Sequence, residues 1–408
     1  MSANLYSSPI KFYIYTFFEN IILSLNLHMH IDLYTIIKVP YVLYSILGIL
    51  LFIQLYYILF VYSKLSRYKV KSYQEAPEFT PVSVLICANN EQENLKQFLP
   101  SILKQDYPNF EVVVVNDFST DETQWILEDF KRQYTHLRVV DIKEHIKLKN
   151  SKKFALTLGI KAAKHEVLIM TDADCQPQSS LWLKEIAGAY ADGKEIVLGY
   201  SPYFQKSGFL NKLIRFETAH TAMSYLSYAI QRNTYMGVGR NLSYLKSLFF
   251  KGKGFNAHMH IKSGDDDLFV NQNATRHNVN IAIHPDAHVY SNPKETWKSY
   301  YKQKARHAGA SVLYKKSHQR MLGAQLITAF LFYVMFIVCV VCYPSLWFVG
   351  VSVFLLRYIC QLTVFWSIYK KLAVKDLIGW LVILDFFYYF YICFNGLFNR
   401  KKKQKSWK

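Results

Sequence analysis

Residues 167–175 read VLIMTDADC, and this stretch decides which fold the chain adopts. The short apolar run 167–170 has the length and composition of a buried strand. Asp172 and Asp174 follow it directly, separated by one residue. In open parallel sheets, ligands bind beyond the carboxyl ends of the strands. Two such carboxylates can hold a hard divalent cation that also takes oxygens from a diphosphate. The stretch therefore predicts a metal and phosphate site on a parallel sheet.

Short β-branched runs alternate with helical segments around this stretch. The predicted strands are 82–87, 112–115, 137–140 and 167–170, and the predicted helices are 94–105, 121–134 and 152–163. This alternation is typical of parallel βαβ units. The middle of the chain is therefore predicted to be an α/β domain.

Two more polar loops follow predicted strands, at 88–91 and 116–121. Turns and helix caps explain either loop equally well when it is taken alone. Three polar loops at one edge of a sheet favour a ligand site instead. The sequence has no GxxxxGK[ST] loop and no GxGxxG after the first strand. Metal and carboxylates, rather than a glycine loop, are therefore expected to handle any phosphate.

Long apolar runs lie on both sides of this domain. Residues 41–62 contain no charged side chain, and a helix of that length covers the roughly 30 Å hydrocarbon core of a bilayer. Residues 322–342 and 346–369 predict two more spans. Residues 376–398 are basic at both ends, so whether they span is left open. Residues 1–40 are interrupted by Lys11, Glu19 and Asp32, which suits an interfacial or short helical segment better than a span.

The charge of the chain fits a membrane protein better than a nucleic-acid-binding protein. The sequence has 48 Lys and Arg against 29 Asp and Glu, a formal net charge of +19, and much of the excess flanks the apolar runs. By the positive-inside rule, the α/β domain should face the cytoplasm from the inner (plasma) membrane. The six cysteines indicate neither a disulfide framework nor a zinc site. The predicted parts are a membrane region 1–77, a cytoplasmic domain 78–320, a second membrane region 321–398 and a basic tail 399–408.

Several short motifs follow one another along the middle of the chain. They are Ala88–Glu91, Asn116–Asp121, Lys152 with Ala155 and Leu156, Asp172–Asp174, Gly237–Asn241, Ser263–Leu268 and Gln303–His307. Together they resemble the motifs of family 2 glycosyltransferases, in the membrane-bound branch that includes cellulose, chitin and hyaluronan synthases. The resemblance covers roughly residues 80–310. It implies a GT-A fold, which is the Rossmann-like α/β fold of nucleotide-diphospho-sugar transferases, and an inverting reaction.

The resemblance also assigns roles to residues on the donor side. Asn90, Glu91 and Asp117 would contact the nucleoside, with uridine as the expected base, and Lys152 would contact the diphosphate. Asp174, together with Asp172, would hold Mg²⁺ or Mn²⁺. Gln303 and Arg306 resemble a Q-x-x-R-W motif that closes over the nucleotide, where a guanidinium can pair with diphosphate oxygens.

On the acceptor side, the resemblance implies that Asp265 is the general base, with Asp266 as second choice. Gly239, Arg240, Asn241 and His307 would lie near the acceptor. The chain departs from the family pattern at Asn116 (usually Asp), Gly264 (usually Glu) and His307 (usually Trp). The change at His307 weakens the case for a polymerase, because that Trp helps bind a nascent polymer. His258 and His260 are expected to be solvent-facing or acceptor-loop residues rather than metal ligands.

The sequence thus predicts a membrane-bound, metal-dependent, inverting glycosyltransferase. Its partners would be a nucleotide sugar, with UDP as the expected carrier, a lipid-linked or cell-surface glycan acceptor, and membrane lipids; nucleic acid is not expected. Two alternatives from other classes stay open: a processive polysaccharide synthase, and a catalytically silent membrane scaffold.

Overall fold

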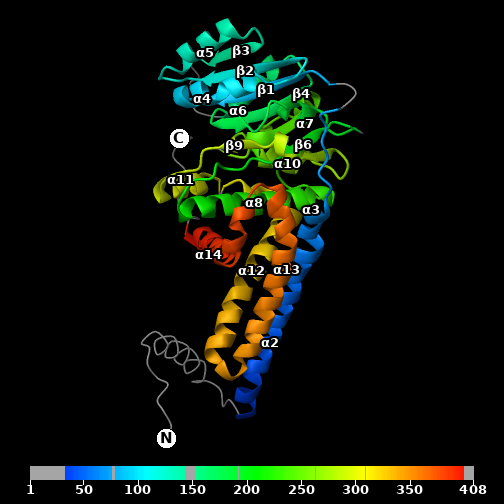
Figure 1. Ribbon diagram of the computed structural model, residues 1–408, viewed down its shortest axis with the longest axis vertical. Helices are drawn as coiled ribbons and strands as arrows, with labels where there is room; N and C mark the ends of the chain where they lie inside the picture. Colours follow the sequence, from blue (N-terminus) through cyan, green and yellow to red (C-terminus); the bar gives the residue numbers. More distant parts are fainter. Residues whose placement is uncertain are drawn as a thin grey trace. The chain divides into compact units, whose positions relative to one another are not determined.

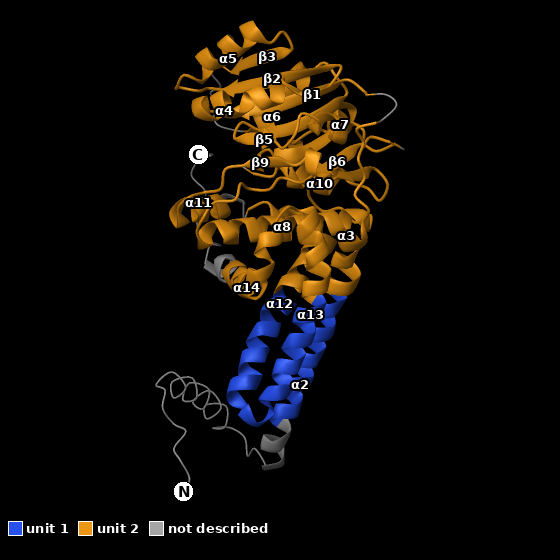
Figure 2. Ribbon diagram, in the orientation of Figure 1, with its two compact units in different colours: residues 1–56, 327–360 blue, residues 57–326, 361–408 orange. Residues whose placement is uncertain are grey.

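The computed structural model describes residues 33–75, 79–142, 152–191, 193–261, 263–307 and 309–398. The chain divides into two compact units, which Figure 2 shows in different colours. Unit 1 comprises residues 1–56 and 327–360, and unit 2 comprises residues 57–326 and 361–408. Unit 2 contains the whole predicted α/β domain, 78–320. The predicted basic tail and the charged positions Lys11, Glu19 and Asp32 lie outside the described residues.

Unit 2 is built on a seven-stranded sheet in the order β3-β2-β1-β4-β7-β6-β8 (Figure 1). The strands are β1 (Val82–Ala88), β2 (Phe110–Asp117), β3 (Leu137–Ile142), β4 (Val167–Asp172), β6 (Ile196–Gly199), β7 (Leu242–Leu245) and β8 (Val279–Ala282). Strands β3, β2, β1 and β4 are mutually parallel, which confirms the predicted βαβ units. Strand β7 runs antiparallel to both β4 and β6, so the sheet is mixed beyond the predicted part.

Helices connect the strands and continue beyond them. They are α2 (Leu33–Tyr56), α3 (Ser63–Arg67), α4 (Gln92–Leu103), α5 (Thr123–Gln133), α6 (Lys152–Ala162), α7 (Trp182–Ala187), α8 (Phe209–Ile230), α9 (Lys246–Lys251), α10 (Asp267–Asn273), α11 (Trp297–His307), α12 (Lys316–Cys342), α13 (Trp347–Lys371) and α14 (Leu381–Phe398). The three predicted helices of the βαβ units are confirmed as α4, α5 and α6, with ends shifted by one or two residues.

Helices cover both faces of the parallel half of the sheet. Apolar residues of α4, α5 and α7 share one buried core with Val84, Ile86 and Val112. Helix α6 packs on the opposite face, where a Cβ added at Gly159 would lie 2.9 Å from Val115 Cγ2. Glycine thus allows close approach of helix and strand. This contact brings the N-terminal residue of α6, Lys152, to the carboxyl edge of the sheet.

A small second sheet lies next to the carboxyl end of β4. It pairs β5 (Cys175–Pro177) with β9 (Val289–Ser291) in antiparallel register, with Cys175 opposite Ser291. The chain leaves β4 at Asp172 and enters β5 at Cys175, so Asp174 lies in the turn between two paired strands. Both ends of the Asp172–Asp174 segment are therefore fixed by backbone hydrogen bonds.

Four helices of the described residues are long and apolar enough to cross a membrane. They cover Val39–Arg67, Lys316–Cys342, Pro344–Lys371 and Lys375–Cys393. The first three contain the predicted spans, and the fourth corresponds to the run 376–398 that the sequence left open. In unit 1, Leu50, Phe332 and Cys339 form a common apolar cluster. The Tyr44 hydroxyl also donates to the Leu346 carbonyl at 2.9 Å. These features are typical of a membrane protein.

Candidate active site

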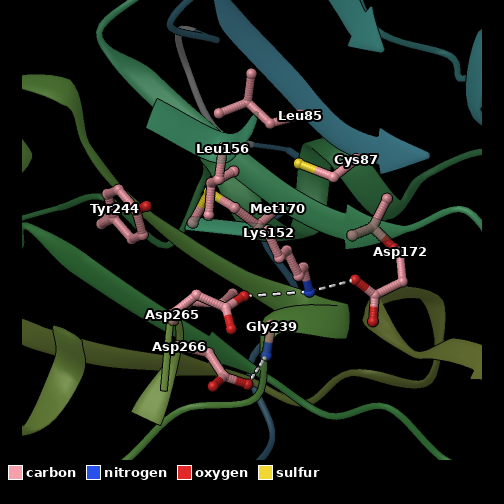
Figure 3. Close-up of a pocket in the computed structure, with 12 residues that line it drawn as sticks. Leu85, Cys87, Lys152, Leu156, Met170, Asp172, Gly239, Tyr244, Asp265 and Asp266 are labelled. Carbon is pink, nitrogen blue, oxygen red and sulfur yellow. Dashed lines mark hydrogen bonds and ion pairs between the residues drawn. The ribbon is translucent and has the colours of Figure 1, made fainter. Parts of the chain in front are cut away.

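A lysine lies between two carboxylates at the carboxyl edge of the sheet (Figure 3). Lys152 Nζ is 2.8 Å from Asp172 Oδ1 and 3.1 Å from Asp265 Oδ2. Lys152 begins α6, Asp172 ends β4, and Asp265 comes from the loop before α10. Burial would lower the pKa of Lys152, but the charges of Asp172 and Asp265 raise it well above its usual value. Residues from three separate segments thus form one charged cluster.

The two carboxylates after β4 have the chemistry of a hard-cation site. Ligand atoms of Asp172, Asp174 and Cys175 lie within 4.8 Å of one another. Burial raises the pKa of Asp174, and the negative charge of Asp172 raises it further. A bound cation would oppose both effects. Burial also raises the pKa of the Cys175 thiol well above its usual value, so the thiol stays protonated and is a poor ligand for a hard cation. The two carboxylates therefore fit Mg²⁺ or Mn²⁺, and Cys175 does not contribute.

Among the three consecutive aspartates at the start of α10, the hydrogen bonds distinguish Asp265 from the other two. Asp266 accepts from Gly239 N and from Asp267 N, both at 2.7 Å, so both of its oxygens are engaged by backbone. Asp267 accepts from Leu268 N and from the Tyr314 hydroxyl, again at 2.7 Å. Asp265 faces Lys152 instead, as Figure 3 shows. Asp266 is thus the residue that caps the N-terminus of α10.

Burial has a large effect on Asp266. Burial first, and the charge of Asp265 second, raise the pKa of Asp266 to about 7.

Gly264, the residue before the three aspartates, is one of the departures from the family pattern, and its conformation explains that departure. Gly264 has φ +88°, and a Cβ added there would lie 2.4 Å from Leu268 Cδ1. The Glu that is usual at this position would be strained in this loop conformation.

The two predicted nucleoside-binding loops are bonded to each other. Asn89 Nδ2 donates to the Asp117 carbonyl at 2.6 Å, and Thr120 N donates to Asn90 Oδ1 at 2.7 Å. Glu91 Oε2 accepts from Asn94 Nδ2 at 2.5 Å. The side chains of Asn90 and Glu91 therefore help to hold these loops in place.

Asp117 differs from its neighbours in these loops. It is buried, with 5% of its surface exposed, and its Oδ2 has no hydrogen-bond partner within the described part of the chain. Burial raises the pKa of this carboxyl group. A buried acceptor without a donor is costly, so among the predicted nucleoside-binding residues Asp117 is the one best prepared for a ligand. Asn116, the departure from the usual Asp, donates to Asp141 Oδ1 at 3.0 Å.

The three residues 239–241 have different surroundings. Gly239 holds Asp266 through its backbone N–H. Asn241 is 1% exposed, and its amide bonds Trp182 Nε1 and two backbone carbonyls. The Asn241 side chain is therefore engaged within the domain rather than presented to an acceptor. The Arg240 guanidinium lies 4.2 Å from the ring centre of Tyr203, and its buried Nη1 has no hydrogen-bond partner among the described residues.

Helix α11, which carries the Q-x-x-R-like motif, is fastened to α8. Glu217 of α8 accepts from the Tyr300 hydroxyl at 2.7 Å and pairs with Lys304 Nζ at 2.6 Å. Gln303 Nε2 donates to the Tyr203 hydroxyl at 3.3 Å, so Tyr203 contacts both Gln303 and Arg240. The side chains of Arg306 and His307 lie outside the described residues.

One functional candidate escaped the sequence analysis. Lys153 is 1% exposed, and its Nζ donates to the carbonyls of His258 and Ile261 at 2.6 and 3.1 Å. Burial lowers the pKa of Lys153 to about 8. Lys153 thus holds the loop that leads to Asp265. The sequence could have indicated this burial, because the helical spacing of Lys153 with Leu156 and Ile160 places all three residues on one face of α6.

The expectation for the two loop histidines is partly wrong. His258 is buried, with 0% of its surface exposed, and its ring Nδ1 is 3.2 Å from Gln272 Nε2. Burial lowers the pKa of His258 to about 4, so the ring packs as a neutral group. His260 is exposed, as expected. Neither histidine belongs to a group of potential metal ligands among the described residues.

The fold and the carboxylate cluster define a GT-A type transferase domain, and the family comparisons agree. The family described as "Glycosyl transferase family group 2" matches residues 169–393, and "Glycosyl transferase family 2" matches residues 83–251. The first match covers more than half of the chain. The chain therefore belongs to glycosyltransferase family 2, and the predicted family and fold are confirmed.

Two curated relatives and one solved structure are similar to parts of the chain. The poly-beta-1,6-N-acetyl-D-glucosamine synthase of Staphylococcus epidermidis is 36% identical over 93 residues, 23% of this chain and 21% of the relative. The probable glycosyltransferase YdaM of Bacillus subtilis is 27% identical over 247 residues, 57% of this chain and 55% of the relative. This chain thus covers about half or less of the length of both relatives.

The solved structure is a mannosyltransferase from Pyrobaculum calidifontis in complex with GDP-Man and Mn²⁺. It is 16% identical, with a TM-score of 0.56, and the match covers 88% of this chain and all of that chain. At this identity, the likeness shows a shared fold.

Proposed function

We propose that the protein is a membrane-bound, metal-dependent, inverting glycosyltransferase. It would move a sugar from a nucleotide donor, expected to be UDP-linked, to a hydroxyl of a lipid-linked or cell-surface glycan acceptor. One observation carries this proposal: Lys152 joins Asp172, on the predicted metal side, to Asp265, the predicted base, within one pocket. Donor-side and acceptor-side chemistry can therefore meet there. A silent scaffold would have no use for this arrangement.

The proposed mechanism is a single displacement that uses Asp265 as the base. The Asp265 carboxylate takes the proton of the acceptor hydroxyl, and the acceptor oxygen forms a bond to the anomeric carbon. The bond from that carbon to the diphosphate breaks, and its electron pair leaves with the nucleoside diphosphate. This single displacement inverts the configuration.

Three other groups would support the reaction from the donor side. The Lys152 ammonium would pair with the diphosphate, and Asp117 would accept a hydrogen bond from the nucleobase. Asp172 and Asp174 would hold Mg²⁺ or Mn²⁺, and the bound ion would offset the charge of the leaving diphosphate. In the free protein, Lys152 is held by Asp172 and Asp265. Donor binding would therefore draw Lys152 away from the base.

We expect the catalytic domain to lie on the cytoplasmic side of the plasma membrane, because nucleotide sugars are made in the cytoplasm. The test is a Lys131→Cys variant, because Lys131 is half exposed on α5, and Cys87 and Cys175 in the same domain are buried. A membrane-impermeant maleimide should label this variant only after the cells are permeabilised. The parent protein measures background labelling. Labelling of the variant in intact cells would contradict the orientation.

The enzyme is expected to add one sugar, or very few, in each encounter with an acceptor. Processive extension needs the polymer held at the membrane entrance, and His307 stands where the family has a stacking Trp. With purified full-length protein, excess donor and limiting acceptor, the products should be acceptors lengthened by a single residue. Long polymer appearing while most acceptor remains unused would favour the polysaccharide synthase. Complete absence of transfer and of donor hydrolysis, across a panel of nucleotide sugars, would reject both.

A further inference from the structure

A basic hollow lies away from the catalytic pocket, in unit 2. It is lined by Gln231, Arg232 and Asn233, which follow α8, and by Arg276 and His277, which lie between α10 and β8. None of the lining residues is acidic. Arg232 and Arg276 are exposed, and neither makes an ion pair with any residue that the structure describes. The hollow therefore presents two uncompensated guanidinium groups.

Neighbouring charges strengthen the positive character of this hollow. Lys194 Nζ donates to the His277 carbonyl at 2.6 Å, which places a third cation beside the lining residues. The carboxylate next to Lys194 in the chain, that of Glu195, accepts from Asn278 Nδ2 at 2.8 Å. Glu195 is thus bonded to Asn278 rather than to either arginine.

The hollow lies beside the ends of the two apolar runs 41–62 and 322–342, which the sequence predicts as spans. Gln231 Nε2 is 3.4 Å from the Val61 carbonyl, and Val61 is at the end of the uncharged run 41–62. Asn233 Nδ2 is 3.4 Å from Met321 Sδ, and Met321 directly precedes the apolar run 322–342. Figure 1 shows α8 beside α3, which agrees with the contacts between these helices. The residues on both sides of Arg232 thus contact the ends of two spans.

The backbone at Arg232 is also unusual. Arg232 has φ +61°, a left-handed conformation that non-glycine residues adopt at a cost. Two bonds hold the turn: Arg232 N donates to the Ala229 carbonyl, and Asn233 N donates to the Tyr228 carbonyl, both at 2.9 Å. The chain therefore holds an exposed arginine beside the ends of the two apolar runs.

We propose that this hollow binds the phosphate headgroup of an anionic membrane phospholipid. A guanidinium offers parallel N–H donors that match phosphate oxygens, and basic residues next to a span are attracted to anionic lipids. The location beside two span ends favours a lipid phosphate over a soluble one. This inference goes beyond the proposed sugar transfer and does not depend on it.

The test compares lipids that differ in headgroup charge. Full-length protein in detergent is titrated with short-chain phosphatidylglycerol or phosphatidylcholine, and bound lipid is counted by native mass spectrometry. The wild type should prefer phosphatidylglycerol. The double variant Arg232→Gln/Arg276→Gln should bind phosphatidylglycerol about 25-fold more weakly, since each basic residue at a membrane surface contributes about a factor of five. Arg276→Gln alone should lose about fivefold, which keeps the test available if the double variant folds poorly.

Arg132→Gln on α5 is the matched control, because Arg132 is equally exposed but pairs only locally with Asp129. This control should keep the wild-type preference. Asp265→Asn should keep it too, even if transfer is lost, which separates lipid binding from catalysis. Unchanged phosphatidylglycerol binding in the double variant would overturn the proposal. Inorganic diphosphate that displaces phosphatidylglycerol at equal concentration would overturn the assignment to a lipid.

Discussion

Asp265→Asn is expected to lower the rate of sugar transfer by roughly 10²–10⁴-fold, the usual contribution of a positioned general base. Asparagine keeps the shape of the side chain but cannot take the acceptor proton. Donor binding should survive, because Asp265 is not among the groups proposed to hold the donor, and its replacement weakens an ion pair that competes with the diphosphate for Lys152. The measurements are transfer rate at saturating donor and donor affinity by calorimetry. A loss of donor affinity equal to the loss of rate would show that Asp265 serves donor binding instead.

Asp266→Asn is the matched control, one residue along the chain. Asp266 engages backbone N–H groups with both oxygens, so its replacement should disturb the loop more than the chemistry. Its pKa of about 7 also predicts a pH signature. Between about pH 4 and pH 7, the Asp266 carboxyl group is protonated in the folded protein but ionised in the unfolded chain. The free energy of unfolding therefore falls as the pH rises through this interval.

The two variants should therefore differ in the pH dependence of their stability as well as in their activity. Asp266→Asn should flatten the pH dependence of thermal unfolding over that interval, while Asp265→Asn should leave most of it. If Asp266→Asn shows the large catalytic loss and Asp265→Asn is nearly silent, the assignment of the base is wrong by one residue.

Asp174→Ala is expected to lower donor turnover by roughly 10²–10³-fold or more, since a bound divalent ion stabilises the leaving diphosphate by several kcal/mol. Removing metal with EDTA should have the same effect on the wild type, and Mg²⁺ or Mn²⁺ should reverse it. The variant should remain folded, because Asp174 lies in the short turn between β4 and β5 and its closest side-chain partners are distant, with Ser291 Oγ at 3.5 Å.

The control for Asp174 is Asp106→Ala. Asp106 is an exposed carboxylate that pairs with Lys184 of α7 at 2.7 Å. This variant should keep wild-type turnover and wild-type sensitivity to EDTA. Full activity of the parent protein in EDTA, or of Asp174→Ala, would reject the metal assignment.

Local patterns were sufficient for the parallel half of the sheet. Strands β1, β2 and β4 appear as apolar runs rich in β-branched residues, since a strand that is buried on both faces needs apolar residues throughout. The candidate spans were equally readable, because a helix in hydrocarbon must be predominantly apolar over about 20 residues. The chain order of the motifs also indicated the family. Strands β6, β7 and β8 were not predicted, because they lie outside the regular alternation of parallel strands and helices; β7 runs antiparallel to both of its neighbours.

The sequence by itself determined the parallel α/β half, the apolar spans and the acidic segments that follow the strands. Only the tertiary structure decided what each acidic side chain contacts. Asp266 is engaged by Gly239, which lies 27 residues away along the chain, and Asp265 faces Lys152. The buried Lys153 reaches carbonyls more than 100 residues distant. The physical reason is range: burial periodicity is set by neighbouring residues, whereas hydrogen-bond partners are set by distant segments that meet only when the chain has folded.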